Sequence, residues 1–145
     1  MLLGLGSGTT ASIFIRLLGE RVKQGLRVQG VPTSSGSAHL AAEGGITVLN
    51  SIDRPLDLAI DGADEIDPAL NLLKGRGGAL VREKLVAASA RRFVVVADSS
   101  KLVDQLGTGV LPVEVIPFLW HETARRLESM GVRWQVRGGE ESPFV

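Results

Sequence analysis

Residues 2–10 read Leu2-Leu3-Gly4-Leu5-Gly6-Ser7-Gly8-Thr9-Thr10 and combine an apolar run, a glycine-rich turn and two threonines. Residues 2–5 predict a short buried strand, and residues 11–23 show the apolar spacing of a helix. A glycine turn between a strand and a helix lets backbone N–H groups approach an anion, and the helix N-terminus adds positive potential. Ser and Thr at this place are equally typical of helix N-caps. The stretch therefore predicts a strand–turn–helix unit, with phosphate binding and capping both open.

The same alternation continues along the chain. Further strands are predicted at residues 26–31, 46–49, 56–60 and 92–97, and further helices at 38–43 and 79–91. The strands are nearly continuous apolar runs, which is typical of parallel strands buried on both faces. We therefore expect an α/β fold with a parallel, Rossmann-like sheet covered by helices. Ligands bind such sheets at the carboxyl ends of the strands, so the unusual loops that follow the strands can converge there.

The regular alternation of apolar strands and helices ends after Gly107. Residues 111–118 predict an extended segment, 120–130 an amphipathic helix and 132–136 a strand. We expect a parallel α/β domain over residues 1–110 and the incomplete start of a smaller α/β subdomain over residues 111–145. The first strand has no preceding helix, and the chain stops soon after a turn-like segment. We therefore expect a chain truncated at both ends, less stable and less active than a complete relative.

Composition argues against several classes of protein. Sixteen basic side chains balance sixteen acidic ones, whereas a nucleic-acid binder usually has a basic excess. No apolar run is long enough to cross a bilayer. Cysteine is absent and there are only two histidines, which disfavours thiolate chemistry and Cys/His metal sites. We expect no metal, no cofactor, no nucleic acid and no membrane as partners.

An acidic segment, Asp61-Gly62-Ala63-Asp64-Glu65-Ile66-Asp67, directly follows the apolar run 56–60. Four carboxylates within seven residues repel one another, which is costly unless they bind something. They could ligate Mg²⁺ or hydrogen-bond sugar hydroxyls. The pattern favours a functional site over a plain surface turn.

Three further segments carry polar groups. Lys74-Gly75-Arg76-Gly77-Gly78 places a lysine before a glycine loop, where it could reach an anion, and Glu83 lies in the helix that follows. Glu83 alone is more simply explained as a solvent-facing helix residue. Residues 33–37 carry hydroxyls that suit either a ligand or a helix cap, and Lys101 after the strand at 92–97 could meet a phosphate or lie on the surface.

In this order the segments resemble the ribose-5-phosphate isomerase A family, from Gly4 to about Phe118 and more weakly beyond. The most specific pieces are DGADEID (61–67), KGRGGALVREK (74–84) and ADSSK (97–101), supported by GLGSGTTA (4–11) and VPTSSGSA (31–38). Arg76 departs from the glycine or small residue that is usual there, and it could crowd the loop or point outward. The family commonly has a threonine at the position of Ser7 and a serine at the position of Thr9, so both differences keep a hydroxyl group.

The resemblance implies an aldose–ketose isomerase that interconverts D-ribose 5-phosphate and D-ribulose 5-phosphate through an enediolate in the pentose phosphate pathway. It implies a cytoplasmic homodimer without a metal requirement. Glu83 would be the proton acceptor, with Asp61, Asp64 and Lys74 as catalytic partners. The substrate-binding residues it implies are Ser7, Gly8, Thr9, Thr10, Asp61, Gly62, Ala63, Asp64, Lys74, Gly75, Arg76, Gly77 and Lys101.

Two alternatives stay open at this point. The first is a non-catalytic sugar-phosphate sensor of related fold, which needs a phosphate-binding site but no catalytic base. The second is an inactive fragment of the isomerase. Glu83 and Lys74 beside the acidic segment favour the enzyme, because binding alone does not require them.

We predict that activity will not respond to metal chelation, because a lysine loop is available to neutralise the acidic segment. The measurement is isomerase turnover with and without EDTA. Activity that vanishes with the chelator and returns with Mg²⁺ would contradict this and would recast Asp61, Asp64 and Glu65 as ligands.

Overall fold

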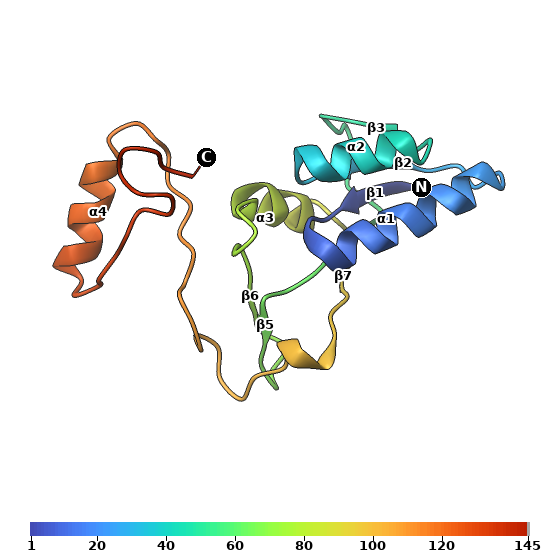
Figure 1. The fold of residues 1–145 in the computed structure, drawn as a ribbon. Helices are drawn as coiled ribbons and strands as arrows, with labels where there is room; N and C mark the ends of the chain where they lie inside the picture. The colour runs from blue at the N-terminus through green and yellow to red at the C-terminus, as the bar shows by residue number, and fades with distance from the viewer. Residues whose placement is uncertain (145) are drawn as a thin grey trace. The chain divides into compact units, whose positions relative to one another are not determined.

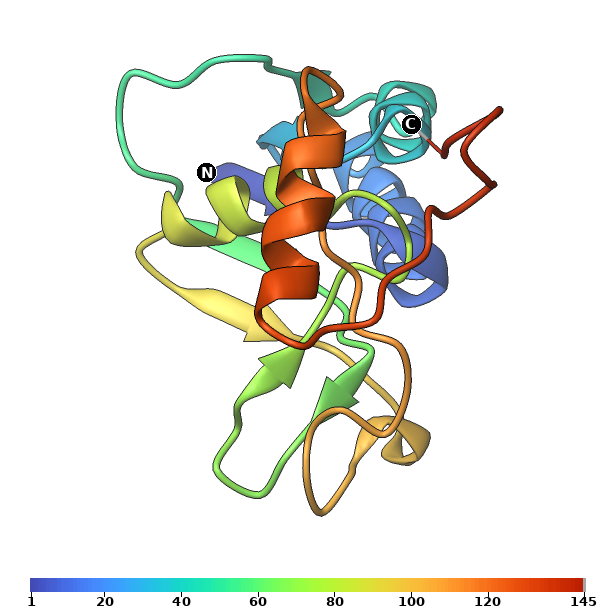
Figure 2. The same cartoon turned by 90° about the vertical axis from the view of Figure 1, so that its left-hand side faces the viewer.

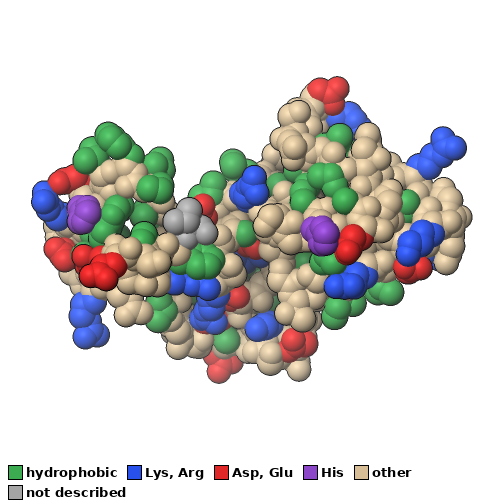
Figure 3. All heavy atoms as spheres, turned by 45° about the horizontal axis from the view of Figure 1, so that its top comes forward, with side chains coloured by type: hydrophobic (Ala, Val, Ile, Leu, Met, Phe, Trp, Pro, Cys, Tyr) green, Lys and Arg blue, Asp and Glu red, His purple; other side chains and the backbone are tan. Residues whose placement is uncertain are grey.

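A computed structural model describes residues 1–144. The chain forms two compact units, Met1–Pro112 and Val113–Val145, and the second is described up to residue 144. Within the described residues, no helix is both long and apolar enough to span a bilayer. Over the face drawn in Figure 3, basic (blue) and acidic (red) side chains are interspersed, as the equal numbers of the two kinds suggest.

The first unit is built on a five-stranded parallel sheet with the strand order β3-β2-β1-β4-β7 (Figure 1). Its strands are β1 (Leu2–Leu5), β2 (Gln29–Pro32), β3 (Thr47–Val48), β4 (Leu58–Asp61) and β7 (Phe93–Val95). Its helices are α1 (Gly8–Lys23), α2 (Ser35–Glu43) and α3 (Leu80–Ala88), with a 3₁₀ turn η1 (Ser99–Lys101) after β7. The predicted parallel α/β fold is confirmed.

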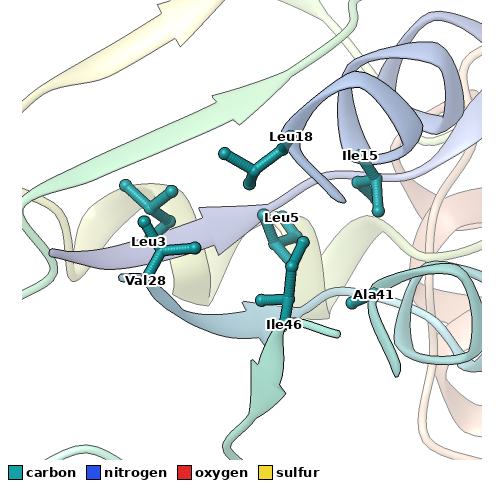
Figure 4. Packing of buried hydrophobic residues seen from close by; sticks show 7 residues of the cluster. All are labelled: Leu3, Leu5, Ile15, Leu18, Val28, Ala41 and Ile46. Carbon is teal, nitrogen blue, oxygen red and sulfur yellow. The ribbon is translucent and has the colours of Figure 1, made fainter. Parts of the chain in front are cut away.

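One face of the sheet carries the main hydrophobic core. Side chains of β1 alternate between the two faces, and Leu3 and Leu5 point toward α1 and α2. They pack there in one buried cluster with residues of both helices and of the segments that follow them (Figure 4): Ile15, Leu18, Val28, Ala41 and Ile46. The cluster fixes β1 beneath α1, and with it the turn that leaves β1.

The opposite face of β1 lies close to α3. A Cβ atom on Gly4 would be 2.5 Å from Cγ1 of Val86 and 2.8 Å from Cβ of Ala59, closer than carbon atoms approach without bonding. Glycine at position 4 therefore allows α3 to approach the sheet. This places the first turn of α3, which carries Glu83, near the end of β4.

A short antiparallel hairpin, which the sequence analysis did not predict, lies between β4 and α3. It consists of β5 (Glu65–Ile66) and β6 (Leu72–Leu73), with Glu65 opposite Leu73. Figure 2 shows it as two separate arrows below the parallel sheet. Asp67 closes its turn by accepting hydrogen bonds from the backbone N and side-chain amide of Asn71 at 2.8 and 2.9 Å. The segment predicted to be an acidic loop is thus partly a strand.

The second unit contains helix α4 (Trp120–Ser129). The rings of Trp120 and Trp134 meet edge to face with centroids 5.9 Å apart, and Nε1 of Trp134 donates to Glu128 at 3.0 Å. The predicted strand at residues 132–136 is wrong, since the structure has no strand there. An alternating apolar pattern does not make a strand without a neighbour to complete its ladder of hydrogen bonds. That residues 111–145 begin a smaller α/β subdomain stays a prediction.

Several boundaries differ from those predicted. Helices α1 and α2 begin three residues earlier than expected, within the polar turns, and α3 ends three residues earlier. The second strand runs from Gln29 to Pro32 instead of over residues 26–31. Propensity places such ends poorly because the caps and turns set them.

We predict that Ile15→Ala destabilises the first unit by about 2–5 kcal/mol, because it leaves a cavity in the core. Ile15 is fully buried, whereas Ile13 on the same helix is 56% exposed, so Ile13→Ala is the matched control and should change stability by less than about 0.5 kcal/mol. Denaturant unfolding monitored by circular dichroism measures both. Equal losses in the two variants would contradict this description of the core.

Candidate active site

Lys74, the residue after β6, lies at the centre of an ionic cluster at the carboxyl edge of the sheet. Its Nζ is 3.1 Å from Oδ2 of Asp61 and 3.3 Å from Oε2 of Glu83. It also donates a hydrogen bond of 2.5 Å to the carbonyl oxygen of Gly62. The two carboxylates expose only 5% and 7% of their side-chain surface. One ammonium group therefore holds together two buried carboxylates that would otherwise repel each other.

Asp61 is the last residue of β4, and the backbone around it fixes its orientation. Oδ1 accepts hydrogen bonds from the backbone N of Ser7 at 3.1 Å and of Gly62 at 2.7 Å. A side chain at position 6 would collide with this carboxylate. Gly6 is thus required for the close approach of the β1 turn to Asp61, a role the sequence did not reveal.

Glu83 lies in the first turn of α3 and is buried. Burial raises the pKa of its carboxyl group, and the nearby charge of Asp61 raises it further, while Lys74 acts in the opposite direction. A carboxylate with a raised pKa is a better proton acceptor than an ordinary glutamate. The interpretation of Glu83 as a solvent-facing helix residue is therefore wrong.

Ser7 occupies the N-cap position of α1, but its side chain does not cap the helix. Its hydroxyl instead pairs with that of Thr33 at 2.5 Å, and the Thr33 hydroxyl is also 3.2 Å from the carbonyl oxygen of Leu5. The turn thus leaves its first helical N–H groups free of a side-chain cap, on Gly8, Thr9 and Thr10 at the start of α1. The other hydroxyl segment does cap a helix, since Ser34 accepts from the backbone N of Ser37 at 3.1 Å.

The acidic segment is divided among separate partners. Asp61 meets Lys74, Asp64 accepts a hydrogen bond from the backbone N of Arg76 at 2.9 Å, and Asp67 holds the hairpin turn. Glu65 is buried and has partners of its own, among them Arg76 and Thr108. Within residues 1–144, no group of three or more His, Cys, Asp or Glu side chains is placed to hold a metal ion.

The glycine loop after Lys74 forms a tight turn. Gly75 and Gly78 have φ values of 108° and 88°, which glycine adopts without strain, and the N of Gly78 donates to the carbonyl oxygen of Gly75 at 2.9 Å. Arg76 does not crowd this loop, because its side chain forms an ion pair with Glu65. Gly77 is exposed in the same turn.

Two further predicted residues, Ala63 and Lys101, lie outside the ionic cluster. Ala63 is half-buried in the turn between Asp61 and Asp64. Lys101 ends η1, after β7. Within the described residues, no hydrogen bond or ion pair joins its side chain to Lys74, Asp61 or Glu83. The structure thus brings together Ser7, Asp61, Gly62, Lys74 and Glu83, while the catalytic and binding roles of all the predicted site residues stay predictions.

Two residues of this region were missed by the sequence analysis. Thr33 was recognised only as part of a hydroxyl-rich loop, although it is buried against Ser7. Thr108, which contacts Glu65 from 43 residues away, carried no local signal. Contacts of this kind depend on tertiary structure alone.

The arrangement suits proton transfer next to an oxygen that develops negative charge. Glu83 can accept a proton, and Lys74 supplies a fixed positive charge beside it. The hydroxyls and N–H groups of the β1 turn and the α1 N-terminus suit an anionic group of a ligand.

Comparison with known proteins gives consistent results. A family model described as ribose 5-phosphate isomerase A (phosphoriboisomerase A) matches residues 29–145. The chain is 48% identical over 147 residues to the ribose-5-phosphate isomerase A of Bacillus mycoides, covering 100% of this chain and 66% of that protein. It is 57% identical over 141 residues to that of Thermomicrobium roseum, covering 94% and 59%.

Solved structures agree with these sequence matches. A D-ribose-5-phosphate isomerase solved in complex with phospho-erythronic acid superposes with a TM-score of 0.87 at 42% identity, covering 100% of this chain and 66% of that one. The ribose 5-phosphate isomerase of Plasmodium falciparum gives a TM-score of 0.91 at 37% identity, with the same coverage. The chain thus spans less than two thirds of the length of these relatives.

We predict that the pKa of Glu83 responds in opposite directions to its two charged neighbours. Asp61→Asn removes a negative charge and should lower this pKa, whereas Lys74→Met removes the compensating positive charge and should raise it. Carbon-detected NMR titration of the Glu83 carboxyl group measures both shifts. Lys23→Met is the control, since Lys23 pairs with Glu20 on the surface of α1. Shifts of the same sign in Asp61→Asn and Lys74→Met would contradict the cluster geometry.

Proposed function

Because the chain belongs to the ribose 5-phosphate isomerase A family, we propose that it interconverts D-ribose 5-phosphate and D-ribulose 5-phosphate in the pentose phosphate pathway. The observation that carries this proposal is the position of Lys74 between the buried carboxylates of Asp61 and Glu83, at 3.1 and 3.3 Å. Proton transfer between adjacent carbons needs a base and a fixed positive charge in one place, and this cluster supplies both.

In the proposed reaction Glu83 is the base. Its carboxylate removes the proton from C2 of the open-chain aldose, the C–H electrons form the C1–C2 double bond, and the carbonyl electrons move to O1. The protonated Glu83 then returns the proton to C1, while O2 becomes the ketone oxygen and its proton passes to O1. Asp61 is less suited to this role, because its Oδ1 already accepts two backbone hydrogen bonds and its Oδ2 meets Lys74.

Lys74 stabilises the enediolate in this scheme. A positive charge held in a buried site acts strongly on a developing oxyanion, since little water competes with it. Asp61 orients Lys74 through their contact. In the same proposal Asp61 and Asp64 pass protons between the two sugar oxygens and assist ring opening.

The phosphate group of the substrate needs a separate site. We assign it to the hydroxyls and first helical N–H groups of Ser7, Gly8, Thr9 and Thr10, with Lys101 as a further positive charge. The backbone N–H groups of the glycine loop 75–77, together with Gly62 and Ala63, would contact the sugar. A structural neighbour was solved with phospho-erythronic acid, which supports a phosphorylated sugar ligand for this chain.

The family also supports the remaining expectations. We propose a homodimer in the cytoplasm, with a small sugar phosphate as ligand and with neither nucleic acid nor membrane as a partner. A non-catalytic sugar-phosphate sensor is less well supported. Such a sensor has no need of a buried glutamate with a raised pKa beside a lysine.

We predict that Glu83→Gln lowers kcat by about a hundredfold to ten-thousandfold while sugar-phosphate binding is retained. The amide keeps the size of the side chain but cannot accept the proton. A coupled isomerase assay measures turnover and calorimetry measures binding. Glu43→Gln, an exposed position at the end of α2, is the matched control and should be fully active. Near-normal turnover in Glu83→Gln would remove Glu83 from the mechanism.

A further prediction concerns pH. Glu83 must be ionised to act as a base, and its pKa lies above the ordinary value of a glutamate. Activity should therefore fall, as the pH is lowered, at a higher pH than an unperturbed glutamate would give, with the loss complete below the pKa of Glu83. A pH–rate profile of kcat/KM measures this. A profile that stays flat down to the ordinary glutamate range would contradict it.

A further inference from the structure

Glu65, the first residue of β5, is a buried carboxylate for which the proposed reaction has no use. Only 2% of its surface is exposed. It accepts hydrogen bonds from the Thr108 hydroxyl at 2.5 Å, from the backbone N of Gly107 at 2.7 Å and of Thr108 at 3.3 Å, and it pairs with the Arg76 guanidinium. One side chain thus joins β5, the glycine loop and the segment 107–108.

These contacts keep Glu65 ionised. The hydrogen bond from the Thr108 hydroxyl, followed by that from the Gly107 amide, lowers the pKa of Glu65 to about 2. A buried carboxylate is costly unless its oxygens are satisfied, and here they are. Glu65 is therefore a stable anionic anchor under all conditions in which the protein would act, and not a group that exchanges protons during turnover.

Glu65 and the preceding residue, Asp64, both hold Arg76. Asp64 accepts the backbone N–H of Arg76 at 2.9 Å, and Glu65 binds the guanidinium of the same residue. Two consecutive carboxylates thus fix both the backbone and the side chain of Arg76. Arg76 is the only residue with a side chain in the turn Gly75-Arg76-Gly77-Gly78. It is therefore the only residue of this turn through which a side-chain contact can hold the turn.

The same anchor also fixes the other end of the loop. In the β5–β6 hairpin the backbone of Glu65 lies opposite Leu73, the residue before Lys74. Glu65 therefore controls the position of the chain just before Lys74 through the hairpin and two residues after it through Arg76. Glycine is conformationally permissive, so these two restraints limit the backbone conformations open to the chain on either side of Lys74.

We propose that Glu65 and Arg76 form a clamp that positions Lys74, and that Glu65 is a positioning residue of the active site without contact to the substrate. This proposal rests on the proposed function for its consequence in catalysis. The geometry of the clamp itself can be tested without any turnover.

The first test is the NMR titration of Glu83 in the free 145-residue chain carrying Glu65→Gln or Arg76→Met. The charged groups that act on Glu83 are Asp61, Lys74 and Asp64. If the clamp directs Lys74, its loss moves the ammonium away from Glu83, and the pKa of Glu83 rises. Asp67→Asn is the matched control, since Asp67 belongs to the same acidic segment but holds only the hairpin turn. An unchanged pKa of Glu83 in both clamp variants would overturn the proposal.

The second test is kinetic. We expect Glu65→Gln and Arg76→Met each to lower kcat/KM for ribose 5-phosphate by about tenfold or more, and to move the acidic limb of the pH–rate profile to higher pH. The double variant should lose little more than either single variant, because both break the same contact. Thermal unfolding of each variant sets an assay temperature at which it is folded. Arg76→Met keeps the test valid if Glu65→Gln does not fold, since Arg76 lies at the surface.

The outcomes separate the two claims. Additive losses, or a lower rate with an unchanged pH profile and an unchanged pKa of Glu83, would show that Glu65 serves stability alone. A wild-type chain without isomerase activity would count against the proposed function, while the titration would still decide whether the clamp directs Lys74.

Discussion

Lys74 places one positive charge 3.1 Å from Asp61 and 3.3 Å from Glu83, and the rest of the site is arranged around this contact. Without the ammonium, two buried carboxylates would face each other, and at least one would take up a proton. With it, Asp61 is held as a fixed partner by the β1 turn, and Glu83 remains the group whose proton affinity is raised. Burial and charge compensation together produce a base and a positive charge in one place.

The parallel sheet makes this contact possible. Strands β1 and β4 are neighbours with parallel register, so the glycine turn after β1 and the acidic segment after β4 leave the sheet at the same edge. Two glycines permit the approach: Gly4 lets α3 pack against β1, and Gly6 leaves room for the Asp61 carboxylate. The site therefore depends on the absence of side chains at two positions as much as on the residues that carry charge.

Much of this could be predicted from the sequence, because the apolar strands and the polar loops after them are local signals. The rule that ligands bind at the carboxyl ends of parallel strands predicted that the loops carrying Ser7 and Asp61 would converge, whereas Lys74 and Glu83 were placed with them only by the resemblance to the isomerase family. The β5–β6 hairpin was missed because two-residue strands show no periodicity, and the strand predicted at residues 132–136 was wrong because a pattern does not supply a pairing partner. The contacts of Glu65 with Gly107 and Thr108 join residues more than 40 positions apart, which no local pattern encodes.

The most direct test of the central claim, that Glu83 moves a proton between adjacent carbons of a sugar phosphate, is isotope exchange in deuterated water. The chain is incubated with ribose 5-phosphate and the products are followed by NMR. The account predicts ribulose 5-phosphate carrying deuterium at C1, because the proton held by Glu83 exchanges with solvent before it is returned, and no deuterium with Glu83→Gln. Sugar-phosphate binding by the wild-type chain without any ketose or deuterium incorporation would contradict the account and would indicate a protein that binds its ligand without converting it.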